Sequence, residues 1–155
     1  MAFLTYCSNP LGTYFIDFSQ ELLNAKDKQG YHPLLYLASR NSKPTIKKVL
    51  ANKNIREGNI KLDLISKDKK TGRSVLHHLV RNKDVDAVGN LLDKDELTVE
   101  VANMPDQDGN SPLIACLLEG SPYMARDILQ HPTAKEKFRI DSCHTKGIYF
   151  AYLNY

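Results

Sequence analysis

Cysteine is scarce in this chain of 155 residues, and the scarcity limits its location and chemistry. The cysteines, Cys7, Cys116 and Cys143, are odd in number and form no Cys-x-x-Cys pair, so neither a disulfide framework nor a zinc module is indicated. No apolar run approaches the ~20 residues of a membrane-spanning helix. The first cation is Lys26, so no secretory signal is indicated. We expect an intracellular, cytoplasmic protein with no membrane partner; the alternatives are the nucleus and, for a secreted effector, a host cytosol.

Familiar catalytic and cofactor signatures are also missing. No Gly-x-Gly-x-x-Gly, P-loop, His-Glu-x-x-His or Gly-x-Ser-x-Gly sequence occurs. His77 and His78 are adjacent, and neighbours on a helix point about 100° apart, so they are poorly placed to share a metal ion. Cys143 and His144 are adjacent in a predicted turn, whereas cysteine hydrolases place nucleophile and base on separate elements. We expect no catalytic residue, no metal site, no cofactor and no small-molecule substrate.

The net charge is small, but the charges are unevenly distributed. The total is +3, yet residues 26–73 contain 13 basic and 4 acidic side chains, while residues 74–155 contain 8 basic and 12 acidic ones. Solvated surface usually explains such runs; the alternative is a two-signed surface that steers a partner of complementary pattern. No aromatic stacking platform lies among the cations, so a nucleic-acid partner is not favoured. The pattern predicts a partner protein with a mixed-charge surface.

Three segments share one pattern. Each has a turn that runs from Asp to Gly, a polar or proline cap, a short apolar helix, a break and a second apolar helix. Gly30, Gly72 and Gly109 suit turn positions with positive φ. The predicted capping and first helical residues are Pro33, Ser74, Asp84, Ser111 and Pro112. Apolar side chains at three- and four-residue spacing predict one buried stripe on each helix.

The helix starts resemble the Thr-Pro-Leu-His-x-Ala core of the ankyrin repeat. The matching segments are residues 32–38, 74–80 and 111–116. The resemblance implies an all-α ankyrin-repeat solenoid of stacked helix-turn-helix units with β-turn fingers. It also implies that His77, at the family's histidine position, forms a hydrogen bond with the neighbouring turn. The middle repeat is similar to repeats of inhibitor-of-NF-κB-type ankyrin proteins, which makes a signalling or transcription-factor partner one variant.

We predict a single ankyrin-repeat domain over residues 1–155. Its predicted parts are an N-terminal partial repeat or cap at 1–26, repeats at 27–66, 67–105 and 106–140, and a partial repeat or cap at 141–155. The glycine spacings of 42 and 37 residues exceed the ~33 of a regular repeat. We expect the surplus, at 52–66 and 93–105, to form long polar loops beside the fingers. The apolar tail at 148–155 either folds back or continues into a longer chain.

The resemblance implies a concave protein-binding face, built from the finger tips and the exposed side of the inner helices. The predicted finger contacts are Lys28, Gln29, Tyr31, Lys69, Lys70, Arg73, Gln107 and Asn110, and the inner-helix contacts are Tyr36, Arg40, His78 and Arg81. Tyr31 and Arg73 are residue types that dominate interface energies, so we expect them to anchor the partner.

The implied function is a non-catalytic protein–protein interaction module, acting as a scaffold or adaptor. The alternative is the docking arm of a larger enzyme or effector, such as a modifying enzyme or a ubiquitin-ligase subunit. In that case the catalytic residues lie outside this segment.

Overall fold

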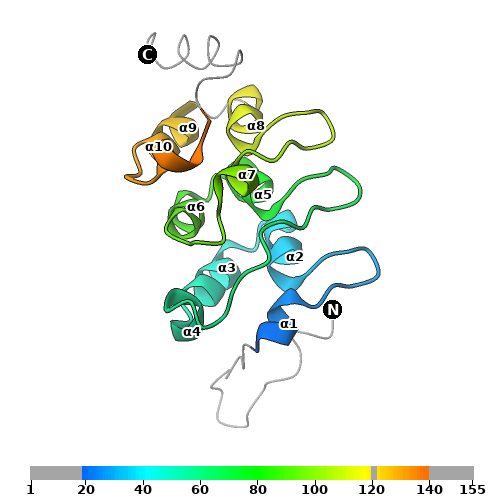
Figure 1. The fold of residues 1–155 in the computed structure, drawn as a ribbon. Coiled ribbons are helices and arrows are strands. Elements are labelled where there is room, and N and C mark those ends of the chain that lie inside the picture. Colours follow the sequence, from blue (N-terminus) through cyan, green and yellow to red (C-terminus); the bar gives the residue numbers. More distant parts are fainter. Residues whose placement is uncertain (1–18, 120–121, 140–155) are drawn as a thin grey trace.

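The computed structural model describes residues 19–119 and 122–139, and its longer helices form two stacked columns (Figure 1). The inner column contains α2 (Pro33–Ser39), α5 (Val75–Arg81) and α8 (Pro112–Leu118), and the outer column contains α3 (Lys43–Leu50), α6 (Val85–Leu92) and α9 (Pro122–Leu129). Each helix packs on its column neighbours and on its partner in the other column. No strand or sheet occurs within the described ranges, so the chain is all-α, as predicted.

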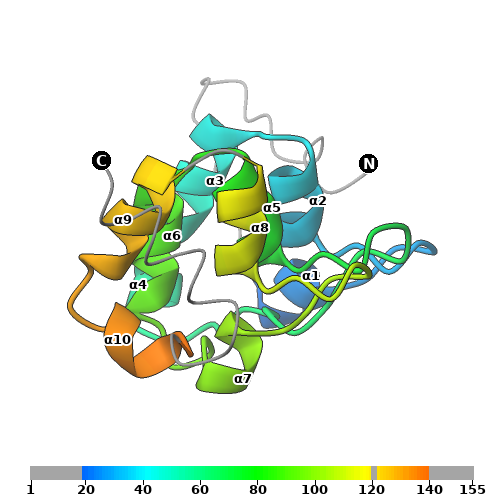
Figure 2. The ribbon, with the colours of Figure 1, turned by 90° about the horizontal axis from the view of Figure 1, so that it is seen from above.

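A loop precedes each inner helix, and all three loops project to the same side of the stack (Figure 2). We call them finger one (27–31), finger two (68–73) and finger three (106–110). The first and last residues of each finger are joined by a backbone hydrogen bond of 2.9 Å from N–H to carbonyl: Asp27 to Tyr31, Asp68 to Arg73 and Asp106 to Asn110. The predicted turns are therefore confirmed.

The aspartate that begins each finger explains why these sequences turn. Its Oδ1 atom accepts two backbone N–H groups from within the finger, from Gln29 and Tyr31 to Asp27, for example, at 2.8 Å each. Asp68 and Asp106 do the same in the other fingers. The glycines at positions 30, 72 and 109 have φ values of +87°, +66° and +81°, which L side chains rarely adopt.

Helix starts follow the predicted capping chemistry. Ser111 Oγ accepts the N–H of Ile114 at 3.4 Å, and an Asp84 carboxylate oxygen accepts the N–H of Ala87 at 3.2 Å. Ser74 is the N-cap of α5, and Pro33 and Pro112 occupy first positions of their helices. Some caps were not predicted, among them the imidazole of His32, whose Nδ1 accepts the N–H of Leu35 at 3.4 Å at the start of α2.

The segments after the outer helices differ from the polar loops that we predicted beside the fingers. Each contains a one-turn helix: α4 (Lys53–Arg56), α7 (Val99–Ala102) and α10 (Ala134–Lys137). The prediction was wrong because apolar residues hidden among the charges enter the core. The buried ones are Ile55, Ile60, Leu62, Leu64, Leu97, Val101 and Ala102. Each unit therefore consists of three helices rather than two.

The remaining predictions on helices have mixed outcomes. The apolar stripes predicted for α3, α6 and α9 are buried, except that Val85 at the first residue of α6 is 40% exposed and Leu129 at the end of α9 is partly buried. α1 (Gln20–Asn24) packs against α2, within the predicted N-terminal partial repeat. Residues 1–18 of that segment and the predicted partial repeat at 141–155 lie outside the described residues. Within the described part of the chain, no helix has the length and apolar character needed to span a bilayer.

Successive fingers touch one another. The N–H of Gln107 donates to the carbonyl of Thr71 at 3.1 Å, and its side-chain Nε2 donates to the carbonyl of Lys69 at 3.2 Å. A methyl group placed on Gly72 would lie only 2.9 Å from the backbone nitrogen of Gln107, while one on Gly109 would meet nothing within 4 Å. Gly72 is therefore required twice, for its positive φ and for the close approach of finger three.

We predict that Gly72→Ala destabilises the protein more than Gly109→Ala. Both changes place a methyl group in the left-handed region, at about 1–2 kcal/mol. Gly72→Ala adds a steric clash of about 1–3 kcal/mol with finger three. Urea denaturation followed by circular dichroism would measure both free energies of unfolding. Equal losses in the two variants would contradict the packing of finger three on finger two.

Candidate functional site

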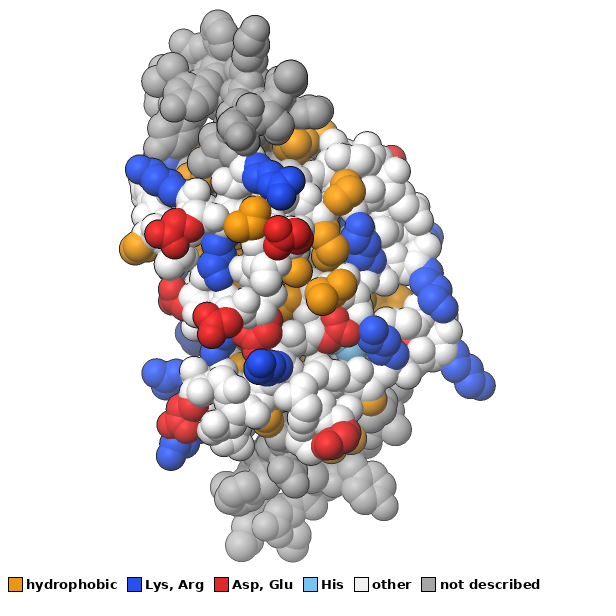
Figure 3. Space-filling view, viewed as in Figure 1, with side chains coloured by type: hydrophobic (Ala, Val, Ile, Leu, Met, Phe, Trp, Pro, Cys, Tyr) orange, Lys and Arg blue, Asp and Glu red, His pale blue; other side chains and the backbone are white. Residues whose placement is uncertain are grey.

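The residues predicted to bind a partner come from the fingers and inner helices, which share one side of the stack. We call this side, formed by fingers one to three and the exposed surface of α2, α5 and α8, the finger face. Basic side chains project from it in Figure 3, and the exposed lysines of its fingers are Lys28, Lys69 and Lys70. Of the other predicted contacts, Gln29, Arg40, Arg81 and Gln107 are exposed, while Tyr31, Tyr36, Arg73 and Asn110 are partly buried.

The first repeat contributes an aromatic cluster to the finger face. The rings of Tyr31 and Tyr36 meet edge to face with their centroids 6.4 Å apart. The guanidinium of Arg40 lies over the ring of Tyr36, 5.5 Å from its centroid. Burial, with the nearby Asp68 and Asp27 carboxylates, raises the pKa of Tyr31, so its hydroxyl stays neutral at physiological pH. Three predicted contacts are thus brought together by the fold.

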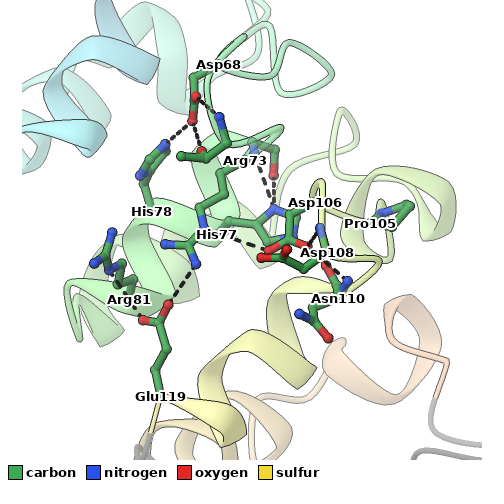
Figure 4. Close-up of polar contacts among 12 residues, drawn as sticks. Asp68, Arg73, His77, His78, Arg81, Pro105, Asp106, Asp108, Asn110 and Glu119 are labelled. Atoms are coloured by element: carbon green, nitrogen blue, oxygen red, sulfur yellow. Dashed lines mark hydrogen bonds and ion pairs between the residues drawn. The ribbon is translucent and has the colours of Figure 1, made fainter.

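His78 does not lie at the surface, contrary to the prediction. It is 8% exposed, and its Nε2 lies 2.9 Å from Asp68 Oδ2 (Figure 4). Burial lowers the pKa of His78, and the Asp68 carboxylate only partly offsets this effect. For Asp68, burial alone would raise the pKa, but hydrogen bonds from Thr71 and His78 outweigh it and lower the pKa. His78 therefore holds finger two against α5 and is unavailable to a partner.

Arg73 is also occupied within the chain. Its Nη2 lies 2.9 Å from Glu119 Oε1 and its Nε 3.7 Å from Asp106 Oδ2, and only 16% of its side chain is exposed. Glu119 also meets Arg81, with 3.4 Å between Oε2 and Nε, so this carboxylate reaches toward both arginines (Figure 4). Arg73 therefore ties the second repeat to the third, and its role as a partner anchor stays a prediction.

Glu119 was missed because nothing in its own neighbourhood marks it. It is the C-terminal cap of α8, after the apolar run that defines the helix. The repeat alignment could have found it, since it places Glu119 level with Asn82, the residue after Arg81. Repeat alignment combined with opposite charge is the signal that identifies such contacts.

His77 forms the hydrogen bond that the resemblance implied. It is 1% exposed, and its Nε2 lies 3.0 Å from the backbone carbonyl oxygen of Asn110 in finger three. Its Nδ1 accepts the N–H of Ser74 at 3.2 Å. The carbonyl of Asn110 is therefore used inside the stack, and His77 positions finger three.

Two features of the described residues concern metal binding and thiol chemistry. They include no group of three or more His, Cys, Asp or Glu side chains placed to hold a metal ion. Burial raises the pKa of the Cys116 thiol to about 11, so a reactive thiolate does not form at neutral pH. The Cys143–His144 pair lies outside the described residues.

Comparison with family models, with curated proteins and with solved structures found no match in any of the three. A function for this chain therefore has to be argued from the residues and geometry of the finger face. Two features of the finger face matter most for a function. One is the set of contacts between the fingers, and the other is the set of side chains that remain exposed.

We predict that Arg73→Ala lowers the free energy of unfolding by about 1–3 kcal/mol, because it leaves the buried Asp106 carboxylate without its cation. Arg81→Ala should cost about 0–1 kcal/mol, since the side chain of Arg81 is 57% exposed and its ion pair is solvated. Chemical denaturation of the two variants tests the difference. Equal effects would remove the argument that Arg73 is structural.

The three buried histidines predict a loss of stability in mild acid. Burial lowers the pKa values of His32, His77 and His78. As the pH falls, these histidines are therefore protonated in the unfolded chain, near a pKa of about 6.5, before they are protonated in the folded one. Stability should be full above that pH and fall as pH drops toward the folded pKa values. The pKa of Asp63 is about 2, so its contribution disappears only below about pH 4.

His32→Asn gives a direct test of this pH dependence. The Asn side chain keeps an oxygen that can cap α2, and the substitution removes the titrating imidazole. No hydrogen bond is lost at the imidazole Nε2, which has no partner among the described residues. Asp63 and Lys26 are the charged groups that act on His32, and neither changes. Urea denaturation at several pH values between about 5 and 7 gives the free energy of unfolding as a function of pH. This dependence should be less steep for the variant than for the wild type. An unchanged slope would show that His32 does not contribute.

Proposed function

We propose that this chain is a non-catalytic ankyrin-type repeat module that binds a partner protein through its finger face. Three units follow one another, each with a finger, an inner helix and an outer helix in the same order. Each finger is closed by an aspartate in the same way. These features support the ankyrin resemblance of the sequence and extend it to the geometry of the turns.

The observation that carries the proposal is the row of fingers held together at the base and exposed at the tips. Gln107 joins finger three to finger two, and His78 and His77 anchor these fingers to α5. Side chains at the tips, including Lys28, Gln29 and Lys70, are exposed. A surface fixed before binding loses little conformational entropy when a partner docks, which favours affinity.

The finger-face residues fall into two groups with different roles. The exposed contacts offered to a partner are Lys28, Gln29, Lys69, Lys70, Gln107, Arg40 and Arg81, with the partly buried Tyr31 and Tyr36 at their centre. The supporting residues, Arg73, His77 and His78, make their contacts within the chain. Asn110, which is partly buried, also stays among the predicted contacts. We propose that the centre of the interface lies at the first two repeats.

Site-specific photo-crosslinking in cells that express the protein would test this function. Gln29 at the tip of finger one and Asn90 on the outer helix α6 are both exposed amides, so they form a matched pair for replacement by a benzophenone amino acid. We expect a discrete protein adduct from position 29 and none from position 90. Mass spectrometry would identify the partner.

Two outcomes would contradict the proposal. Adducts that form equally at both positions would indicate nonspecific contact, and an adduct at position 90 alone would move the interface to the outer column. Circular dichroism of the two purified variants provides the control, since both should retain the helical spectrum of the unmodified protein.

A further inference from the structure

The acidic groups of the finger face are largely satisfied within the chain. Asp68 accepts from the backbone of finger two, from Thr71 and from His78. Asp106 accepts two N–H groups and lies beside Arg73, and Glu119 meets Arg73 and Arg81. These three carboxylates are therefore engaged in internal hydrogen bonds and ion pairs. They have little left to offer a cationic partner.

The basic groups of fingers one and two are not satisfied in this way. Among the described residues, no carboxylate forms an ion pair with Lys28, Lys69, Lys70 or Arg40, although all four are exposed. Arg40 contacts the ring of Tyr36 instead. The two fingers thus carry positive charge that the fold leaves uncompensated. Such a concentration of one sign attracts a group of the opposite sign.

Packing brings these cations together. Cε of Lys69 lies 3.4 Å from the position that a methyl group on Gly30 would occupy. The side chain of Lys69 therefore extends from finger two across to finger one, the finger that carries Lys28. Lys69 therefore lies beside Gly30, the residue before Tyr31, and the three lysines and the Tyr31–Tyr36 pair belong to two adjacent repeats. An aromatic surface bordered by cations suits a ligand with both carboxylates and carbon-rich surface.

We infer that fingers one and two bind an acidic segment of the partner protein, with carboxylates paired to Lys28, Lys69 and Lys70 and an apolar side chain against Tyr31 and Tyr36. This inference rests on the proposed protein-binding function and adds the chemistry of the partner. It also changes the mixed-charge partner expected from the sequence, because Asp68, Asp106 and Glu119 of the finger face are already in use within the chain.

A protein segment fits better than a nucleic acid. The guanidinium of Arg40 covers one face of the Tyr36 ring, which leaves less aromatic surface for base stacking. Asp27 and Asp108 are exposed on fingers one and three and would repel a continuous phosphate backbone. Carboxylates spaced along a peptide can avoid these two positions.

The spacing between fingers limits the pattern of the segment. Neighbouring helices pack about 8–10 Å apart, and an extended chain advances about 3.3 Å per residue. Acidic residues about three positions apart would therefore face successive fingers. An acidic segment with an aromatic or aliphatic residue between its carboxylates meets this requirement.

Two double charge reversals distinguish binding at the finger face from a general effect of net charge. Lys69→Glu with Lys70→Glu alters finger two, while Lys47→Glu with Lys48→Glu alters exposed lysines of the outer helix α3 that have no ion pair with a described residue. Both variants change the net charge equally. Neither pair contributes a side chain to the core. A nonspecific electrostatic effect would weaken binding to both variants, whereas a site on the fingers would weaken binding to the Lys69/Lys70 variant alone.

The test selects peptides from a random display library on the immobilised wild-type protein. We expect the enriched peptides to contain more Asp and Glu than the starting library, together with an apolar residue. Fluorescence anisotropy with the most enriched peptide should show at least about tenfold weaker binding to the Lys69/Lys70 variant. Its affinity for the Lys47/Lys48 variant should stay within about twofold of wild type.

Other outcomes would overturn the inference. Enrichment of neutral or basic peptides, failure to enrich any peptide, or equal losses in both variants would each exclude an acidic segment at fingers one and two. Tighter binding of single-stranded oligothymidylate than of the acidic peptide would assign the cations to nucleic acid. If crosslinking from position 29 succeeds while the peptide test fails, protein binding stands and only the acidic partner is lost.

Discussion

The aspartate at the start of each finger is the residue on which the rest of the site depends. Its carboxylate accepts backbone N–H groups that would otherwise lack partners in a tight turn, and so gives each finger a fixed shape. Fingers with a fixed shape can contact one another through their backbones, as Gln107 does with Thr71. The local hydrogen bonds of one residue type thus determine whether a continuous face exists.

Local chemistry made much of this fold predictable. The turns, the glycine positions, the caps at Ser111 and Asp84 and the apolar stripes depend on residues close in sequence, and all of these were correct apart from Val85 and Leu129 at the ends of their helices. The features that were missed depend on distant residues. Burial of His78 requires Asp68 ten positions earlier, and the ion pair of Arg73 requires Glu119 from the next repeat.

The error in the connecting segments has a related cause. Charged and other polar residues together outnumber the apolar ones in the segment from 52 to 66, but the buried residues Ile55, Ile60, Leu62 and Leu64 fix its position. An average over composition hides such a pattern, because a few buried side chains outweigh many solvated ones in free energy. Two of the twelve predicted site residues are engaged with a carboxylate 2.9 Å away within the chain: His78 with Asp68, and Arg73 with Glu119. The other ten are exposed or partly buried.

Lysine side chains link the segments that contain the short helices of successive repeats. These links bear on how repeats can be added to the array or exchanged within it. Lys94 donates to the carbonyl of Ile55 one repeat earlier, and Lys137 donates to the carbonyl of Lys94. A main-chain carbonyl is present whatever residue occupies the position, so these links require only that the later repeat supply a lysine. Duplication or exchange of a repeat therefore preserves this connection without a matching substitution in its neighbour. Acetylation of the lysine would remove the charge that makes it.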